Sequence, residues 1–367
     1  MGERGPLPGK RKKVVAWVRR EISLGRLKRG MPLPSRKWFC ERFGIAPVPV
    51  QQAFDELRED GLIIAVPGHG TRVADRLPFA DRYLLLLMSR ADNVGSQLFP
   101  KALRKAAAAV EHRRQVKIDV RDLMDAQGDS VPYAEMMNDV RRLRYAGVIA
   151  QGVTESGHGL DTVTNVDGVP MAYFGNPSAL TQGSHTVSLP IYTDGWRKAL
   201  FQCMFDDLRA AGASKVSVFQ PDDRGCDSRS RFVELAAASG LTLVEDGFQC
   251  IEVNRWSPRQ VDRLFCLFLR SDAGRLADGI LLGDDNFLPL FADACRKVLG
   301  RSGAGRYRIV SHCNFPHPPQ VDFPCRFRGP DLEGTIQAFL DYADDCHAGK
   351  RRPRPPELPI GSDSLFS

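Results

Sequence analysis

Apolar residues recur at helical spacing in two segments near the N-terminus. The first segment spans residues 11–24, and its apolar face is formed by Val14, Val15, Val18 and Ile22. The second runs from about Pro47 to Asp60, and its stripe is formed by Val50, Ala53, Phe54 and Leu57. Spacings of three and four residues place side chains on one face of an α-helix. Each segment is therefore predicted to be an amphipathic helix.

Between these two segments the sequence predicts another helix, bounded by a turn and by capping residues. Gly30 interrupts the first pattern, and Ser35 offers a hydroxyl that can cap a helix N-terminus. The helix would bury Phe39 and Phe43, and Gly44 would end it.

A β-hairpin is predicted directly after the third helix. Residues 62–66 are apolar and form the first strand, Pro67-Gly68-His69-Gly70 form a turn, and residues 71–73 form the second strand. Three helices followed by a hairpin predict an α+β winged helix, which we assign to residues 1–75.

From residue 83 onward, short apolar strands alternate with helix-length segments such as Phe99–Val110. The predicted strands are Tyr83–Met88, Val116–Val120, Gly147–Ala150, Met171–Phe174, Val216–Phe219, Gly279–Leu282 and Tyr307–Ser311. Continuous apolar strands of this kind occur in parallel sheets covered by helices on both faces. We therefore predict a linker at residues 76–82 and a two-lobed α/β domain at residues 83–367.

Composition limits the class of protein. The chain has 367 residues, of which 43% are hydrophobic, and this content is typical of a globular protein. Its apolar runs are far shorter than a membrane span, and no secretory leader is recognisable. The nine cysteines form no C-x-x-C pair and are expected to be reduced thiols. These features predict a soluble cytoplasmic protein that does not contact membranes.

Charge is distributed unevenly along the chain. Residues 1–80 hold 16 Lys and Arg against 8 Asp and Glu, whereas the rest of the chain is nearly neutral. A basic segment beside a neutral domain is typical of a nucleic-acid-binding module, because neutralised phosphates supply most sequence-independent affinity. A basic tail without function is the alternative.

The N-terminal segment resembles the DNA-binding domain of the GntR family. The motifs that carry the resemblance are G-x-x-L-P-S at residues 30–35, A-x-x-x-L-x-x-x-G-L-I at 53–63 and G-x-G-T at 68–71. The resemblance implies that the partner is a double-stranded DNA operator. It also implies that Ser35, Arg36 and Lys37 meet the DNA backbone, that the third helix enters the major groove from Pro47, and that His69, Gly70 and Thr71 touch the minor groove.

One departure from the family bears on base recognition. The family usually has Ser or Thr followed by Arg where this chain has Ala46 and Pro47. Val48, Gln51 and Gln52 therefore become the candidate base-facing residues, because glutamine can pair with adenine and apolar groups can contact thymine methyls. The alternative is an ordinary solvated helix face, and His69 is equally compatible with an exposed turn.

The remaining chain is similar to the periplasmic-binding-protein-like sensor domain of LacI/GalR repressors. The matching segments are VPMAYFGN, DLRAAGASKVSVF, DGILLGDDNFLPLFADAC and ELPIGSDSLFS. A GntR-type head joined to such a sensor is the arrangement of arabinose-responsive repressors. The resemblance implies a small-molecule effector, most simply a sugar, bound outside the carboxyl ends of the strands.

Sugar recognition requires carboxylates, guanidinium groups and an aromatic face. The candidate effector-binding residues follow predicted strands or begin helices: Arg90, Asp92, Asn93, Asp194, Trp196, Arg229, Arg231 and Asp285. Arg229 and Arg231 are alternative matches to the family's ligand-binding arginine, and Asp285 best matches its aspartate. Surface or capping roles remain open for each. A metal site at His312, Cys313 and His317 is disfavoured because no fourth ligand accompanies it.

These observations favour an effector-controlled regulator, most simply a homodimeric repressor. Two alternatives remain, a constitutive DNA-binding protein whose larger domain only dimerises, and an enzyme with a DNA-binding head. The sequence has no G-x-S-x-G, P-loop or H-E-x-x-H motif, and residues 150–300 show no obvious cofactor lysine. We therefore expect neither a catalytic activity nor a cofactor.

Overall fold

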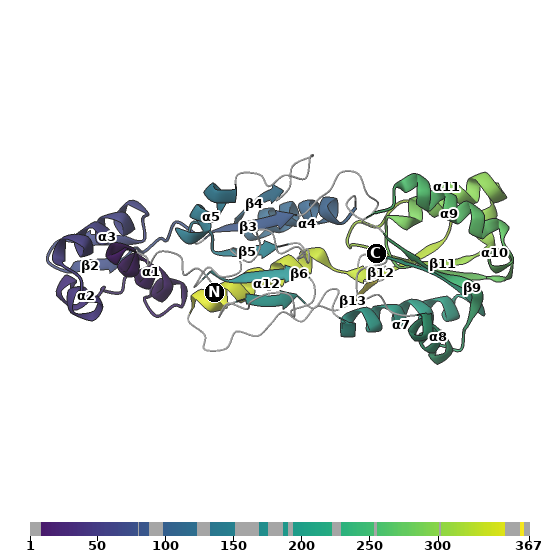
Figure 1. The fold of residues 1–367 in the computed structure, drawn as a ribbon, viewed down its shortest axis with the longest axis horizontal. Coiled ribbons are helices and arrows are strands. Elements are labelled where there is room, and N and C mark those ends of the chain that lie inside the picture. The colour runs from purple at the N-terminus through teal and green to yellow at the C-terminus, as the bar shows by residue number, and fades with distance from the viewer. Residues whose placement is uncertain are drawn as a thin grey trace, which may run out of the picture.

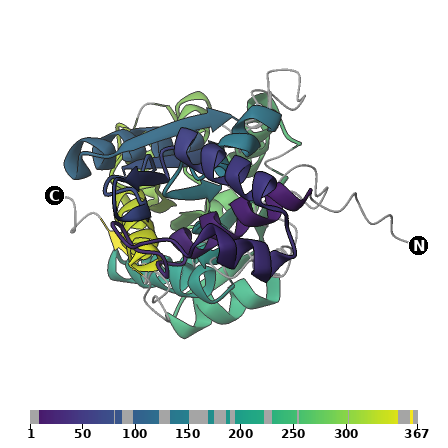
Figure 2. The ribbon, with the colours of Figure 1, turned by 90° about the vertical axis from the view of Figure 1, so that its left-hand side faces the viewer.

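The molecule consists of three bodies that follow one another along its long axis (Figure 1). The computed structural model describes residues 9–79, 81–87, 98–122, 133–150, 169–174, 186–189, 194–221, 229–252, 255–300, 302–348 and 360–362. A small head occupies one end, a first lobe the middle and a second lobe the other end. Figure 2 shows the head in front, with the lobes behind it. None of the described helices combines the length and the apolar composition required to span a bilayer.

The head has the predicted winged-helix arrangement. Its elements are α1 (Lys10–Ser23), α2 (Arg36–Phe43), α3 (Pro47–Glu59), β1 (Ile63–Val66) and β2 (Gly70–Val73). The apolar stripes of α1 and α3 are fully buried against each other, as their spacing predicted. The two strands pair antiparallel, with Ile63 opposite Val73.

The ends of α2 are fixed by the residues expected from the sequence. The Ser35 hydroxyl accepts a hydrogen bond from the Trp38 amide at 3.2 Å, and this satisfies one of the free N–H groups of the first turn. Gly44 adopts the left-handed conformation, with φ of 62°, which ends the helix. Leu33 donates to the Thr71 carbonyl at 2.9 Å, so the segment before α2 is joined to the hairpin.

The first lobe is built on a five-stranded parallel sheet in the order β4-β3-β5-β6-β7. Its elements are β3 (Arg82–Leu87), α4 (Leu98–Arg114), β4 (Lys117–Asp122), α5 (Tyr133–Arg141), β5 (Gly147–Ala150), β6 (Met171–Phe174) and β7 (Thr186–Leu189). Four of these strands were predicted from their apolar runs. The fifth, β7, was not, because Thr and Ser alternate with Val and Leu along it and leave no continuous apolar run.

The second lobe contains a six-stranded sheet in the order β13-β12-β11-β10-β8-β9, in which only β13 is antiparallel. Its strands are β8 (Lys215–Pro221), β9 (Thr242–Ile251), β10 (Gly279–Leu282), β11 (Arg308–His312), β12 (Cys325–Pro330) and β13 (Ile360–Ser362). Its helices are α7 (Asp194–Ala210), α8 (Arg229–Ala238), α9 (Pro258–Arg270), α10 (Asp272–Leu276) and α11 (Phe287–Leu299). Helices α7 and α8 lie on one face, and α9 and α11 on the other (Figure 1).

The chain passes between the two lobes three times. It crosses after β7, returns after β12 to form α12 (Leu332–His347) in the first lobe, and crosses again to β13. Helix α12 packs beside α4 and against β5. A Cβ atom on Gly147 would lie only 2.9 Å from Cζ of Phe339, so the close approach of α12 to β5 depends on glycine at this position.

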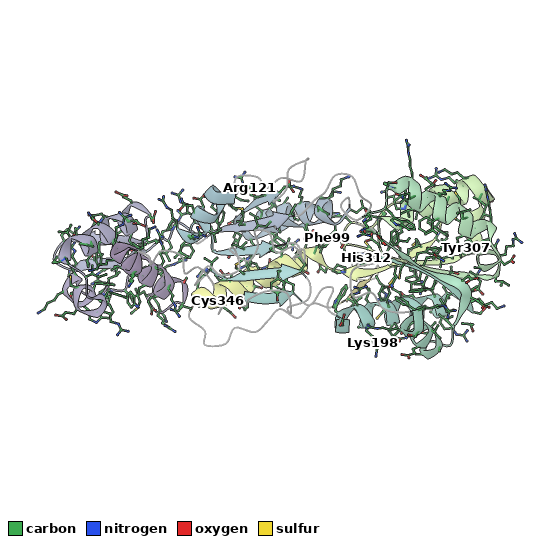
Figure 3. All side chains as sticks on the ribbon, in the orientation of Figure 1. Phe99, Arg121, Lys198, Tyr307, His312 and Cys346 are labelled. Atoms are coloured by element: carbon green, nitrogen blue, oxygen red, sulfur yellow. The ribbon has the colours of Figure 1, made fainter. Side chains whose placement is uncertain are left out.

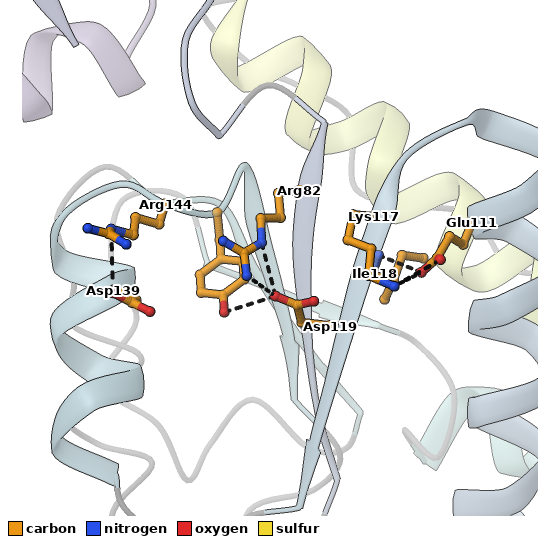
Figure 4. A network of polar contacts seen from close by, with 8 residues as sticks. Arg82, Glu111, Lys117, Ile118, Asp119, Asp139 and Arg144 are labelled. Atoms are coloured by element: carbon orange, nitrogen blue, oxygen red, sulfur yellow. Dashed lines mark hydrogen bonds and ion pairs between the residues drawn. The ribbon is translucent and has the colours of Figure 1, made fainter. Parts of the chain in front are cut away.

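The head is joined to the first lobe through packed residues. The predicted linker at 76–82 contains two buried residues, Leu77 and Phe79. The Phe79 ring lies 5.1 Å from that of His347 in α12. Arg82 then begins β3 with its guanidinium Nη2 2.7 Å from the Asp119 carboxylate, which also accepts from Tyr145 (Figure 4). The domain limits 1–75 and 83–367 remain our proposal, with a packed connection between them.

The packing of α12 can be tested with Phe339, whose side chain is fully buried. Phe339→Ala leaves a cavity between α12 and β5, and we expect the free energy of unfolding to fall by about 3–5 kcal/mol. Denaturant unfolding of the intact chain measures this change. Gln337→Ala, on the same helix but partly exposed, is the control and should change stability by about 0.5 kcal/mol or less. Equal effects of the two substitutions would contradict the position of α12 in the core.

Candidate functional site

The predicted backbone-binding residues lie together at the N-terminus of α2. Ser35, Arg36 and Lys37 are exposed. The Ser35 oxygen accepts the capping hydrogen bond, which leaves its own O–H available to donate to a phosphate. The Lys37 side chain is 85% exposed and lies 3.9 Å from Glu41, a surface pair that contributes little stability. A helix N-terminus flanked by two cations is suited to binding an anion.

The N-terminal turn of α3 presents the predicted base-facing residues. Pro47 occupies the first turn, where a missing N–H costs nothing, and Ala46 provides no side-chain cap. Val48 is 66% exposed, and Gln52, one helical turn later, is also exposed. Gln51 differs because its amide donates to the Asp55 carboxylate at 2.8 Å. The structure therefore brings Val48 and Gln52 onto one accessible face and leaves Gln51 engaged within the helix.

The wing presents an exposed turn held by its own backbone. His69 and Gly70 are exposed, and Thr71 is half-buried. Gly68 and Gly70 have φ values of 73° and 77°, a conformation that glycine adopts without strain. Arg72 is held away from this turn, since its guanidinium donates to the Gly30 carbonyl at 3.0 Å.

Ion pairs hold three arginines of α1 and α3. Arg19 pairs with Asp60 and Glu56, Arg11 lies 3.3 Å from Glu56, and Arg58 lies 2.9 Å from Asp55. These pairs join α1 and α3 or lie along α3. Among the described residues the cations of the α2 N-terminus have no comparably close acidic partner, so their charge remains available to an anion.

A cluster of aromatic rings fixes α2 against α1. The Trp17 ring lies 5.2 Å from that of Trp38 and 5.4 Å from that of Phe39, while Phe39 contacts Phe54 of α3 at 5.4 Å. Such contacts contribute more than burial alone. They hold the N-termini of α2 and α3 in a fixed relation, which a phosphate-binding and a base-reading helix require.

A second candidate site lies at the carboxyl ends of the second-lobe strands, near the boundary with the first lobe. Figure 3 shows Phe99 of the first lobe and His312 of the second close to this boundary. Polar residues follow the buried strands here, with Asp284 and Asp285 after β10 and Asn314 after β11. Asp285 is only 3% exposed and accepts a hydrogen bond from the Asn314 amide at 2.6 Å.

One of these polar residues connects the lobes. Asn286 donates to Asp284 Oδ1 from its backbone at 2.8 Å and from its side-chain amide at 2.7 Å. These bonds orient the amide so that its oxygen accepts from the Leu98 backbone at 3.2 Å. Because Leu98 is the first residue of α4, a hydrogen bond joins the β10–α11 connection to the first lobe.

Burial controls the ionisation of this cluster. Desolvation and repulsion from Asp285 raise the pKa of Asp284, because both disfavour the charged carboxylate. Desolvation also raises the pKa of Asp285, although hydrogen bonds from Asn314 oppose this shift. Burial lowers the pKa of His312, and the nearby Asp284 only partly offsets this, so the imidazole is neutral at neutral pH.

The other predicted effector residues have different surroundings. Asp194 begins α7 and is exposed, and its carbonyl accepts from Arg231 of α8 at 3.2 Å. Trp196 is buried, so its ring contributes to the core of the second lobe. Arg229 is exposed at the first residue of α8. The remaining candidates, Arg90, Asp92 and Asn93, lie outside the described residues.

Sequence reasoning identified Asp285 but did not assign roles to Asp284, Asn286 or Asn314. The doublet Asp284-Asp285 directly after an apolar strand is the signal that could have found the first of these. The link between Asp285 and Asn314 depends on the pairing of β10 with β11, which the sequence does not display. Within the described part of the chain, no group of three residues is arranged to hold a metal ion.

Comparison with known proteins identifies the head. The family model described as bacterial regulatory proteins, gntR family, matches residues 10–73. The transcriptional repressor NagR of Bacillus subtilis is 36% identical over 61 residues, which cover 17% of this chain and 25% of NagR. The chain therefore spans about a quarter of the length of this curated relative.

Solved structures share the fold of the larger domain. A LacI family regulator from Bifidobacterium animalis subsp. lactis has a TM-score of 0.52 at 13% identity, covering 77% of this chain and 96% of that one. The regulator CelR in complex with cellobiose has a TM-score of 0.54 at 12% identity, covering 87% and 91%. A periplasmic solute-binding protein from Actinobacillus succinogenes with bound D-allose has a TM-score of 0.53 at 11% identity, covering 78% and 98%. The N-terminal segment is thus a GntR-type winged helix-turn-helix domain, and it is joined to a two-lobed domain with the fold of LacI-type regulators and periplasmic binding proteins.

Proposed function

We propose that this chain is a sequence-specific DNA-binding transcriptional regulator, acting as a repressor, whose DNA affinity is controlled by a sugar-like effector. The observation that carries the proposal is that one chain joins a GntR-type head to a two-lobed domain. The two lobes meet beside acidic side chains, of which Asp285 is buried. A cytoplasmic location follows from this function, since the operator is in the cytoplasm.

The head binds duplex DNA with its helix N-termini. Ser35, Arg36 and Lys37 neutralise and position phosphates, while Val48 and Gln52 reach base edges in the major groove. The wing turn around His69 approaches the adjacent minor groove. Two heads in a homodimer present this surface to a palindromic operator, which matches the two-fold symmetry of such regulators.

The larger domain reports effector binding through the relative position of its lobes. An effector held by Asp285 stabilises one arrangement of the lobes, and coupling to DNA requires that the two arrangements bind it with different affinity. The hydrogen bond from Leu98 to Asn286 lies between the lobes beside Asp285. The head is expected to move with the first lobe, because two contacts join them. The Phe79 ring packs on His347, and the Arg19 guanidinium donates to the Arg141 carbonyl.

Two other functions have less support. An enzyme with a DNA-binding head would use the carboxyl groups and the neutral imidazole of the cluster as acid and base, but no sequence motif identifies a reaction, and the head matches a family of regulatory proteins. A domain that only dimerises does not require Asp285 to be buried beside Asp284 at the boundary between the lobes, where burial of charge is costly.

Lys37→Glu tests the docking of α2. Replacing a phosphate-binding cation with an anion should weaken binding to a duplex selected by the wild-type chain by at least about ten-fold. The slope of log affinity against log salt concentration should also fall by the amount expected for the loss of about one to two phosphate contacts. Fluorescence anisotropy across a salt series measures both quantities.

The matched control is Lys198→Glu, which makes the same charge change on α7 in the second lobe, far from the head (Figure 3). It should leave the affinity and the salt dependence close to those of the wild type. Unchanged binding by Lys37→Glu would refute the proposed docking.

Gln52→Ala tests base reading by α3. Loss of a bidentate amide contact should cost about 1–3 kcal/mol of discrimination at one base pair and leave the overall salt dependence unchanged. Selection from a randomised duplex library with each variant measures the change. Gln51→Ala is the comparison and should have a smaller effect, because Asp55 already holds that amide. An unaltered selected sequence for Gln52→Ala would remove this residue from base recognition.

A thermal-shift screen of the intact chain against pentoses, hexoses, sugar acids and phosphosugars tests effector binding. A ligand that binds the native state raises the melting temperature, and Asp285→Ala should abolish the shift. Asp272→Ala, an exposed position on α10, is the control. A shift that survives Asp285→Ala would exclude Asp285 from the site, whereas silence across the panel favours a different effector class or the dimerisation role.

A further inference from the structure

We propose that the effector carries a protonated amine, whose ammonium group is bound between Asp284 and Asp285 with Asn314 as a further acceptor. This inference rests on the proposed function and names the chemical class of its ligand. It follows from three features of the cluster, which are its charge, its incomplete hydrogen bonding and its position between the lobes.

The first feature is negative charge without a basic partner. Asp284 and Asp285 are adjacent in the chain; Oδ1 of Asp284 accepts from Asn286, and Oδ2 of Asp285 accepts from Asn314. Within the described residues no lysine or arginine forms an ion pair with either carboxylate, and the imidazole of His312 lies near Asp284. His312 is itself neutral at neutral pH.

The backbone supplies only part of the compensation. The two carboxylates lie at the N-terminus of α11, where Phe287 and Leu288 donate to the carbonyls of Asp284 and Asp285 at 3.1 and 3.3 Å. A helix N-terminus acts as about half of one positive charge. The donors to the carboxylates themselves are the neutral amides of Asn286 and Asn314, so a net negative charge remains that one ammonium group balances.

The second feature is a buried acceptor that lacks a donor. Asn314 is 1% exposed, and its amide nitrogen is bonded to Asp285, but among the described residues its Oδ1 has no hydrogen-bond partner. A buried acceptor without a partner costs free energy that a ligand donor can recover. An ammonium group has three donors, which match two carboxylates and one amide oxygen.

A neutral hydroxyl fits this cluster less well. It donates one hydrogen bond and leaves the charge of the pair unchanged, so one carboxyl group must stay protonated. An ammonium group brings its own positive charge and forms charge-assisted bonds, which are about twice as strong as neutral ones. Desolvation raises the pKa of both carboxyl groups, and a bound cation would favour their charged forms.

The third feature links the site to lobe position. Asn286, whose amide is oriented by Asp284, is also the residue that accepts from Leu98 of the first lobe. A cation that fixes Asp284 therefore also fixes the side chain that joins the lobes. Amine binding and the arrangement of the lobes are coupled through this one residue.

The experiment compares matched pairs that differ by an amine. Calorimetric titration of the intact chain uses glucosamine with glucose, galactosamine with galactose, ethanolamine with ethylene glycol, and putrescine with butanediol. We expect at least one amine to bind about ten-fold or more tightly than its neutral counterpart, which corresponds to about 1.4 kcal/mol. Asp284→Asn keeps the side-chain shape, removes the charge and should abolish this preference.

Asp272→Asn provides the same charge change on the exposed surface and should retain the preference. A neutral member that binds as tightly as its amine, a preference that survives Asp284→Asn, or no binding by any amine would each overturn the ammonium site. The wild-type comparison remains decisive even if Asp284→Asn is unstable. Failure of the regulator proposal is separate, since it appears as absence of sequence-selective DNA binding by the intact chain.

Discussion

The packing of α12 against the first lobe is the interaction on which the two-lobed architecture depends. This helix follows the last parallel strand of the second sheet, yet its buried residues belong to the core of the first lobe. The chain must therefore cross back, and β13 must cross again to complete the second sheet. Three crossings at one boundary connect the lobes. One continuous apolar cluster runs from the head through the first lobe to the α7 and α8 face of the second sheet, and a second cluster lies under α9 and α11.

Polar residues that follow the carboxyl ends of strands lie at the same boundary. Strand β10 is fully buried from Gly279 to Leu282, and of the two acidic residues that follow it Asp285 is buried and Asp284 is half-buried. Removing acidic groups from water is costly, and donors from Asn286 and Asn314 offset part of this cost. The stability of the apolar strands thus supports an electrostatically unfavourable pair of carboxyl groups.

At the opposite end of the molecule, the head separates structural charges from accessible ones. Arg19 is engaged with Asp60 and Glu56, whereas Arg36 and Lys37 remain exposed at the α2 N-terminus. The arrangement follows from the helix geometry, which buries one face of α1 against α3. The head contacts the first lobe through Phe79 and α12, the helix that also bounds the crossings. A physical path therefore exists between the lobe boundary and the DNA-binding face.

Local sequence signals predict the winged helix, most of the parallel strands of both lobes and the position of Asp285 after β10. Helical spacing, capping residues and continuous apolar runs are local signals, and local hydrogen bonding and burial obey them. Strands β7, β9 and β12 were not recognised, because polar and charged residues interrupt their apolar pattern.

The hydrogen bonds between polar residues depend on the tertiary structure. Asp285 reaches Asn314 because β10 pairs with β11, and Asn286 reaches Leu98 because α4 of the other lobe faces it. Likewise, Gln51 and Gln52 are equivalent in sequence, and only the contact with Asp55 distinguishes them. Such contacts join residues far apart in the chain or depend on a chosen side-chain orientation. Local periodicity predicts neither long-range contacts nor side-chain orientations. The sequence pattern therefore predicts the helices and strands, whereas the arrangement of the site residues depends on the fold.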